Sequence, residues 1–206
     1  MLDLTVHRSI LARSHWVFDL DGTLTEPVHD FAAIRAALGI PDGRDILGHL
    51  GDLSPADASP LYARLDAIEL ELCERTAAAP GALRLLEELT VRGARVGVLT
   101  RNTRANALRT LAAIGAGQFF TPPAVLGRDE ALPKPDPDGL HRLSGQWGTT
   151  PAALVMVGDY LFDLQTGRAA GTATVHVDRS RNFPWPELTD VAVGTLDELA
   201  DCLGDS

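Results

Sequence analysis

The sequence predicts an α/β protein built on a doubly wound parallel β-sheet, with helices on both faces and one helical insertion. Short apolar runs alternate along the chain with amphipathic helical patterns. Most positions in these runs are apolar, which is typical of strands covered on both faces. One segment, 28–79, contains helical patterns but no convincing strand. These observations together favour a layered sheet interrupted once by helices.

Four apolar runs are predicted to be strands, and a fifth run has a weaker pattern. The first, at 16–20, ends at a turn that begins with Asp21 and Gly22. The later runs lie at 95–100, 153–158 and 173–177, with the weak candidate at 190–193. Amphipathic helices are predicted between them, including 81–92 and 103–114. A sheet of this kind binds its ligand beyond the carboxyl ends of its strands.

The length of 206 residues allows a full core but is short for two independent domains of ordinary size. We therefore predict one core domain formed by residues 1–27 and 80–206. A helical cap of two or three helices is predicted at 28–79. Pro27 and the Pro80-Gly81 pair mark the two ends of this insertion, where hinge-like loops are expected.

The chain is acidic, with 28 acidic and 18 basic residues and a formal net charge of −10. Such a charge repels the phosphate backbone of nucleic acids, so we do not expect nucleic-acid binding. A small anionic substrate remains compatible with this charge. Within a cleft, a bound divalent cation and one placed lysine outweigh distant surface charge.

Targeting and disulfide signals are both missing from the sequence pattern. Cys73 and Cys202 are far apart and have no paired or metal-like spacing, which gives no support to a disulfide framework or a zinc site. Residues 1–15 lack the apolar run of a signal peptide, and no later run is long enough to span a membrane. We predict a cytoplasmic protein that is a monomer or a homodimer.

The strongest chemical signal is the motif DLDGT at 19–23, which places two carboxylates at the end of a buried strand. A turn that begins here can bring both carboxyls to the same end of the sheet. Beside a bound cation, Asp19 is suited to attack phosphorus and form an aspartyl phosphate, and Asp21 is suited to transfer protons. An ordinary Asp-Gly turn explains Asp21 without any chemistry. A buried Asp19, in contrast, needs a partner or a metal.

The second signal is GDYLFD at 158–163, where a strand ends and a helix opens. Asp163 lies one helical turn after Asp159 and faces the same way. Magnesium is usually held by one or two carboxylates, with waters and substrate phosphate oxygens completing its shell. Asp19 and Asp159 are candidates for these two carboxylates. Helix capping is the alternative explanation for Asp159 or for Asp163 taken singly. It explains the two residues together less well.

Two smaller features lie between these motifs. Thr100 and Arg101 follow the second predicted strand, where a hydroxyl and the next backbone amides are suited to hold a phosphate at a helix start. A simple helix cap explains the same residues equally well. Lys134 lies among three prolines, which stiffen the backbone and hold its ammonium in place. A single loop lysine is otherwise usually just solvated.

Together the four features resemble the haloacid dehalogenase superfamily. Its ordered motifs are an Asp-x-Asp-Gly-Thr strand end, a Thr or Ser, a Lys, and a Gly-Asp-x-x-x-Asp. All four occur in this order between residues 17 and 171. The insertion directly after the first strand resembles the helical-cap branch that includes phosphoglycolate phosphatases. The resemblance implies a Rossmann-like core with a small α-helical cap.

The same resemblance implies a magnesium-dependent phosphatase that acts on a small phosphorylated metabolite. In it, Asp19 is the nucleophile and Asp21 is the general acid and base. Thr100 and Lys134 are ligands of the phosphoryl group. Asp19, the backbone carbonyl of Asp21 and Asp159 hold the magnesium ion.

Other positions are less closely defined by the family pattern. Asp163 is expected to orient the metal shell or to pair with Lys134. Glu26 and Pro27 stand where many relatives have an Asp-Ser pair, and Tyr160 stands where Ser is frequent. These departures argue against assigning phosphoglycolate as the substrate of this protein on the strength of the resemblance.

Basic residues in or beside the predicted cap are expected to be ordinary solvated side chains, and none is assigned to the substrate. They are His29, Arg35, Arg44, His49 and Arg64.

Three alternative functions stay open at this point. A phosphosugar mutase would share every motif and would differ in what accepts the aspartyl phosphate. A dehalogenase of the same fold does not retain the second acid of the first motif, so Asp21 argues against it. A non-catalytic binding protein would be favoured by the loss of a motif residue, and none is lost.

Overall fold

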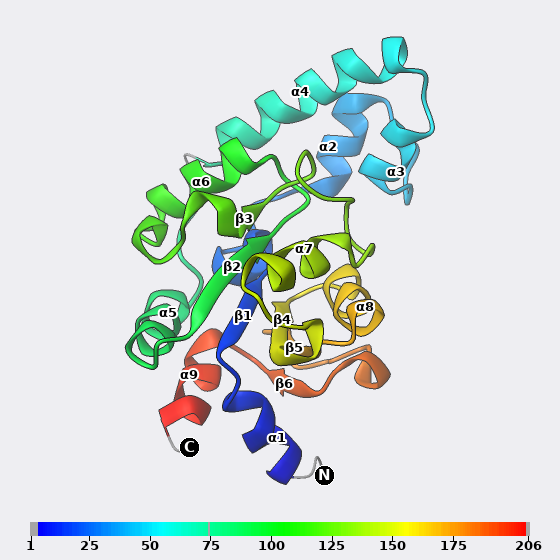
Figure 1. Ribbon diagram of the computed structural model, residues 1–206. Helices are drawn as coiled ribbons and strands as arrows, with labels where there is room; N and C mark the ends of the chain where they lie inside the picture. The colour runs from blue at the N-terminus through cyan, green and yellow to red at the C-terminus, as the bar shows by residue number, and fades with distance from the viewer. Residues whose placement is uncertain (1–3, 74, 205–206) are drawn as a thin grey trace.

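The computed structural model describes residues 4–73 and 75–204, and its centre is a six-stranded sheet in which all paired neighbours are parallel (Figure 1). The order across the sheet is β3-β2-β1-β4-β5-β6. The strands are β1 (His15–Phe18), β2 (Arg95–Leu99), β3 (Val125–Leu126), β4 (Leu154–Gly158), β5 (Ala173–Val177) and β6 (Val191–Val193). The predicted doubly wound α/β class is confirmed.

The first strand ends earlier than the apolar run predicts. β1 stops at Phe18, although the backbone N–H of Asp19 still donates to the Val157 carbonyl at 2.8 Å. The chain then forms a π-helical turn, η1 (Leu20–Leu24), in which Gly22 has a φ of 97°. Only glycine adopts this φ at little cost, so the turn in the motif depends on it. β3 is the one strand that the sequence analysis missed.

Helices cover both faces of the sheet. Trp16 and Phe18 point into an apolar cluster that includes residues of α1, α5, α6 and α9, while Val17 points into a second cluster with α7. This alternation is what a strand buried on both faces requires. The core helices are α1 (Leu4–Leu11), α5 (Ala82–Val91), α6 (Arg104–Ala113), α7 (Asp138–Gln146), α8 (Leu161–Ala170) and α9 (Leu196–Gly204). Short 3₁₀ turns lie at η2 (Gly117–Phe119), η3 (Pro122–Ala124), η4 (Pro151–Ala153) and η5 (Pro186–Leu188).

The described part of the helical insertion contains three helices and lies at the end of the molecule opposite to the two termini (Figure 1). The helices are α2 (Phe31–Leu38), α3 (Ile46–Gly51) and α4 (Pro55–Cys73). Asp30 and Asp45 cap the first two helices through their carboxylates. The insert has an apolar cluster separate from those of the sheet, formed by Ile34, Leu38, Ile40, Leu47, Leu50 and Leu65.

Two short segments connect the insert to the sheet, and they run side by side. Thr25 and Ala78 form an antiparallel bridge. The Glu26 N–H donates to the Ala77 carbonyl at 2.9 Å, and the Ala79 N–H donates to the Leu24 carbonyl at 2.9 Å. The insert therefore leaves and rejoins the core through one paired connection.

Within residues 4–73 and 75–204, no helix combines the length and the apolar character needed to cross a bilayer.

A pair of substitutions in α5 tests the packing of the sheet face. Leu86 is fully buried in the first cluster, so Leu86→Ala should lower the free energy of unfolding by about 2–5 kcal/mol. Val91, in the same helix, is 88% exposed, and Val91→Ala should change it by no more than about 0.5 kcal/mol. Urea unfolding measures both values. Similar losses in the two variants would contradict this packing.

Candidate active site

The site lies where the strand order reverses. From the central strand β1, the chain moves outward through β2 and β3 on one side, and through β4, β5 and β6 on the other. Ligands of such sheets bind in the crevice at this switch point, beyond the carboxyl ends of the strands. Asp19 directly follows β1 and Asp159 directly follows β4, which is its hydrogen-bonded neighbour. The topology therefore brings the first and last motifs together.

Lys134 joins two of the carboxylates. Its Nζ contacts Asp19 Oδ1 and lies 2.6 Å from Asp163 Oδ1, and all three residues are buried. Burial by itself would lower the pKa of this ammonium, but Asp163 and Asp19 together raise that pKa above its ordinary value. The lysine therefore stays charged. The prediction left two roles open for Asp163, and the pairing with Lys134 is the one that the contacts display.

Asp159 has a tight local environment. The Thr23 hydroxyl donates to Asp159 Oδ1 at 3.1 Å. A Cβ at Gly22 would lie 2.6 Å from Asp159 Oδ2, which is closer than real contacts allow. The glycine and threonine of the DLDGT motif thus shape the space that Asp159 occupies.

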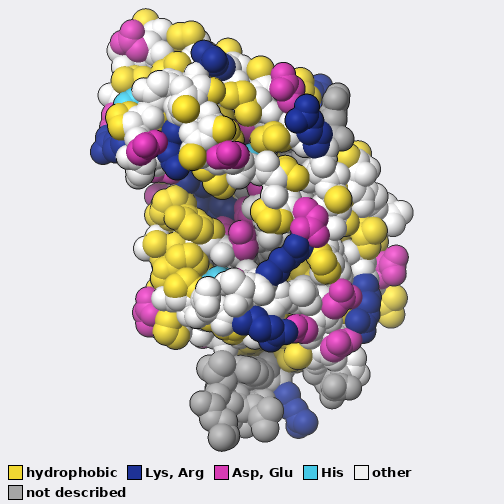
Figure 2. Space-filling view, turned by 180° about the vertical axis from the view of Figure 1, so that it is seen from behind, with side chains coloured by type: hydrophobic (Ala, Val, Ile, Leu, Met, Phe, Trp, Pro, Cys, Tyr) yellow, Lys and Arg dark blue, Asp and Glu magenta, His cyan; other side chains and the backbone are white. Residues whose placement is uncertain are grey.

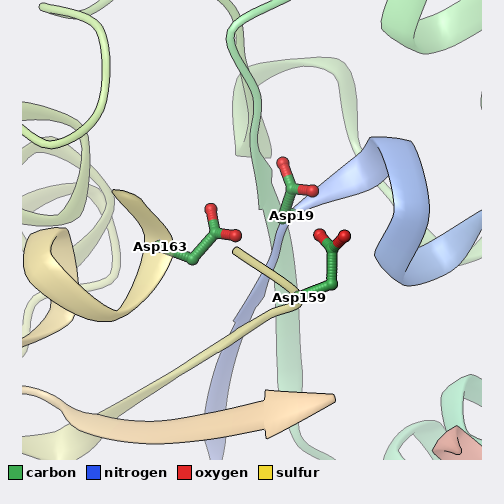
Figure 3. A group of neighbouring side chains, drawn as sticks. All are labelled: Asp19, Asp159 and Asp163. Carbon is green, nitrogen blue, oxygen red and sulfur yellow. The ribbon is translucent and has the colours of Figure 1, made fainter. Parts of the chain in front are cut away.

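Three carboxylates come close enough to share one cation. Oxygens of Asp19, Asp159 and Asp163 all lie within 4.8 Å of one another, and Figure 3 shows the three side chains converging. Burial, with the nearby Asp19 and Asp163, raises the pKa of Asp159 to about 8. Burial also raises the pKa of Asp163 to about 6, against the opposing effect of Lys134. Crowded carboxylates with raised pKa values suit a hard divalent cation with oxygen ligands, such as Mg²⁺.

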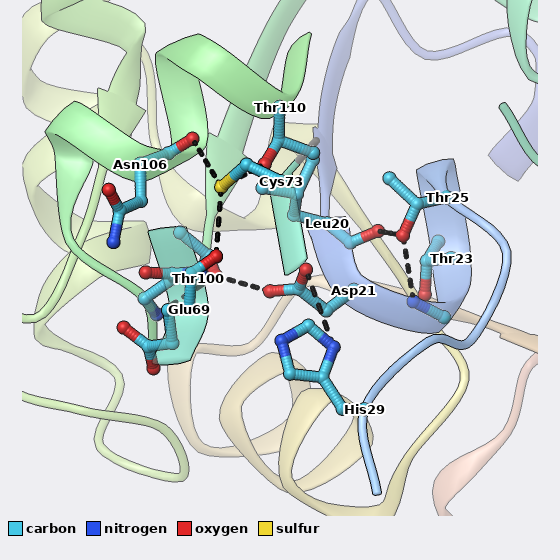
Figure 4. Close-up of polar contacts among 12 residues, drawn as sticks. Leu20, Asp21, Thr23, Thr25, His29, Glu69, Cys73, Thr100, Asn106 and Thr110 are labelled. Carbon is cyan, nitrogen blue, oxygen red and sulfur yellow. Dashed lines mark hydrogen bonds and ion pairs between the residues drawn. The ribbon is translucent and has the colours of Figure 1, made fainter. Parts of the chain in front are cut away.

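Asp21 faces a different group of side chains from Asp19. One of its oxygens lies 3.9 Å from His29 Nδ1, and the other lies 3.5 Å from the Thr100 hydroxyl, as Figure 4 shows. The Asn102 N–H in turn donates to that hydroxyl at 3.1 Å. Burial raises the pKa of Asp21 above its ordinary value, with a smaller contribution from Asp19. A carboxyl with a raised pKa keeps its proton to a higher pH than an ordinary one, which suits a group that donates protons.

Arg101 is the predicted residue whose contacts differ most from the prediction. Its guanidinium pairs with Asp45 of the insert at 2.7 Å and lies over the Phe162 ring, 4.8 Å from the centroid. In this structure the side chain therefore links the sheet end to the insert.

A cavity of about 450 Å³ separates the sheet from the insert, and Figure 2 shows a recess between these two parts. All the predicted site residues line it: Asp19, Asp21, Thr100, Arg101, Lys134, Asp159 and Asp163. The insert contributes apolar side chains, including Ile34, Leu47 and Leu65, together with a similar number of polar and charged ones. An anionic group can thus reach the lysine and the carboxylates while the rest of a ligand lies against the insert.

Several residues at the cavity were missed by sequence reasoning. His29 was expected to be solvated, but its side chain is only 10% exposed because it packs beside Asp21 and stacks on Phe31. Glu69 also lines the cavity, and burial raises its pKa to about 7 even though Arg128 donates to both its oxygens, at 3.0 and 3.2 Å. One signal was available, because Glu69 interrupts the buried stripe of α4.

The strand order, the buried lysine and the convergent carboxylates define an α/β enzyme with an acidic site suited to a metal and an anionic ligand. A profile described as haloacid dehalogenase-like hydrolase matches residues 32–177, which is more than half of the chain. The chain belongs to the haloacid dehalogenase-like hydrolase family. The resemblance found in the motifs is therefore confirmed.

Individual relatives agree with this assignment. A haloacid dehalogenase-like hydrolase domain-containing protein of Arabidopsis thaliana is 34% identical over 182 residues, covering 81% of this chain and 71% of that protein. A phosphoglycolate phosphatase of Rhodospirillum rubrum is 31% identical over 187 residues, covering 77% of each. The crystal structure of a hydrolase from Pseudomonas syringae has the same fold, with a TM-score of 0.75 and 22% identity over 94% of this chain and 98% of that one.

The crowding of the carboxylates predicts a pH-dependent loss of stability without metal. The pKa of Asp159 is about 8 in the folded chain and about 4 in an unfolded one, so its cost to stability grows as the pH rises from about 4 to about 8. In EDTA, Asp159→Asn should be more stable than the wild type at pH 8 by about 2 kcal/mol or more, and nearly equal to it at pH 4. Urea unfolding at both pH values measures this difference.

Added Mg²⁺ should stabilise the wild type and not Asp159→Asn, because a cation that binds only the folded state shifts the equilibrium toward it. Asp42→Asn, at an exposed position of the insert, is the control for removing one negative charge. A stability difference that does not depend on pH or on Mg²⁺ would contradict this account of the site.

Proposed function

We propose that this protein is a magnesium-dependent phosphatase that removes phosphate from a small phosphorylated metabolite through an aspartyl-phosphate intermediate. The observation that carries the proposal is the convergence of Asp19, Lys134 and Asp159 at the switch point of the sheet. Membership of a hydrolase family, and a relative that bears the name phosphoglycolate phosphatase, support the same reaction class.

In the first step, an oxygen of Asp19 attacks phosphorus and the bond between phosphorus and the leaving oxygen breaks. Asp21 gives its proton to that oxygen, so the product leaves as an alcohol. The raised pKa of Asp21 supports this role. Water then attacks the phosphorus of the aspartyl phosphate while Asp21 takes a proton from the water. The bond between the Asp19 oxygen and phosphorus breaks, which releases inorganic phosphate and restores the Asp19 carboxylate.

The phosphoryl group is held by Lys134, the Thr100 hydroxyl and the backbone at Arg101. Lys134 contacts Asp19 directly, so its charge lies beside the oxygen that attacks. Phosphoryl transfer depends mainly on positioning and on charge stabilisation, and a fixed ammonium contributes to both.

Magnesium would be held by Asp19, Asp159 and the backbone carbonyl of Asp21, with Asp163 orienting this group, and it would supply positive charge beside the phosphoryl oxygens. The raised pKa values of Asp159 and Asp163 support a cation at this position.

We also propose that residues 28–79 form a cap that encloses the substrate, on a core of residues 1–27 and 80–206. The separate apolar cluster of the insert and its paired connection to the sheet support this division. Enclosure by such a cap excludes water from the reacting atoms. A cytoplasmic location and a monomeric or homodimeric state complete the proposal.

The nucleophile is tested by one substitution. Asp19→Asn should lower Mg²⁺-dependent release of phosphate from para-nitrophenyl phosphate by at least about a thousandfold, because the amide cannot form the covalent intermediate. Phosphate release is measured with and without EDTA, and Asp42→Asn serves as the control. Full activity of Asp19→Asn would reject the mechanism, and conversion of a sugar phosphate to an isomer without phosphate release would favour a mutase.

A further inference from the structure

An arginine of the insert faces the cavity without an acidic partner. Arg35 lies on α2 and lines the same cavity as Asp19 and Lys134. Its Nε is buried and has no hydrogen-bond partner within the described part of the chain. The other lysine and arginine residues that line the cavity all have carboxylate partners: Lys134 with Asp19 and Asp163, Arg101 with Asp45, and Arg44 with Asp52.

The isolation of Arg35 has an energetic cost. Removing a polar N–H from water without an acceptor is unfavourable. The chain has 28 acidic residues for 18 basic ones, so acidic groups are abundant. A ligand that brings its own anion would supply the missing acceptor. The planar guanidinium is well matched to a carboxylate or a phosphate, which it can bind through two parallel hydrogen bonds.

Arg35 reaches the cavity from a different side than the residues of the proposed phosphoryl site. Arg35 belongs to the insert, whereas Asp19 and Lys134 lie at the sheet end. Among the described residues, no hydrogen bond or ion pair joins Arg35 to any of the four site aspartates. The apolar side chains of Phe31 and Ile34 line the same cavity from the same helix. Because Lys134 already supplies the cation at the proposed phosphoryl site, we assign an anion at Arg35 to the leaving group of the substrate.

We propose that Arg35 binds a second anionic group of the substrate, so that the substrates are small phosphate esters whose leaving group carries a carboxylate or a second phosphate. This inference rests on the proposed function and narrows its substrate class. It also assigns a binding role to Arg35, which the sequence pattern predicted to be an ordinary solvated side chain.

Three two-carbon esters test this inference: 2-phosphoglycolate, ethane-1,2-diol bisphosphate and the neutral 2-hydroxyethyl phosphate. Phosphate release with Mg²⁺ gives kcat/KM for each ester. The wild type should prefer at least one anionic ester over the neutral one by about tenfold or more, and the preferred ester distinguishes a carboxylate from a second phosphate. Arg35→Gln should reduce this preference by about tenfold, mainly through KM.

Arg64→Gln is the matched control, because Arg64 is an exposed arginine of the same insert and does not line the cavity. This variant should keep the wild-type preference. Arg35→Lys keeps the charge but not the planar fork, so it should retain part of the preference. Urea unfolding of each variant shows whether the fold is intact, and Arg35→Lys decides the question if Arg35→Gln does not fold.

The outcomes separate this inference from the proposed function. No hydrolysis of para-nitrophenyl phosphate by the wild type with Mg²⁺ would overturn the proposed function, and this inference with it. Hydrolysis of that ester without a preference for either anionic ester would overturn this inference alone. The inference would also be overturned if Arg35→Gln kept the wild-type preference for the anionic ester. The same holds if Arg64→Gln lost as much of that preference as Arg35→Gln.

Discussion

The buried contact of Lys134 with Asp19 and Asp163 is the interaction on which the rest of the site depends. Removing these charges from water is costly, and the cost is met only if the charges are paired. Burial, together with the charge of the neighbouring carboxylates, raises the pKa values of Asp159 and Asp163, and one ammonium does not cancel these effects. The architecture thus keeps a local excess of negative charge that a cation would offset.

Glycines allow this crowding to exist. A Cβ at Gly158 would lie 2.2 Å from the Asp163 Cβ, and a Cβ at Gly22 would press on Asp159. Both glycines sit at strand ends or in the turn that follows, where the carboxylates must approach each other. Gly22 and Gly158, which have no reactive side chain, therefore allow the close spacing of the site aspartates.

The insert is held over the site by charge as well as by packing. Arg128, in the loop after β3, contacts Asp66 and Glu69 of α4 and donates to the Arg101 carbonyl at 3.1 Å. Arg101 itself reaches Asp45 at the start of α3. Two neighbouring core loops thus bind two different helices of the insert. These contacts join the two walls of the cavity.

Sequence patterns predicted the parts of this structure whose signals are local. A strand end followed by an aspartate is visible in the chain itself, and parallel topology then brings Asp19 and Asp159 to one edge. The short strand β3 follows two prolines and has only two residues, too few for any periodicity. Contacts such as that of Arg128 with Glu69 were also not predictable, because 59 residues separate the partners and no pattern links them.

The bridge between Thr25 and Ala78 has a consequence for how such a chain can vary. Because the two ends of the insert are hydrogen-bonded neighbours, everything between them can lengthen, shorten or be exchanged without moving a strand. The sheet and its carboxylates then form a constant part, and the helices above them form an exchangeable one. A chain built in this way can acquire a new ligand preference while the chemistry beneath it stays the same.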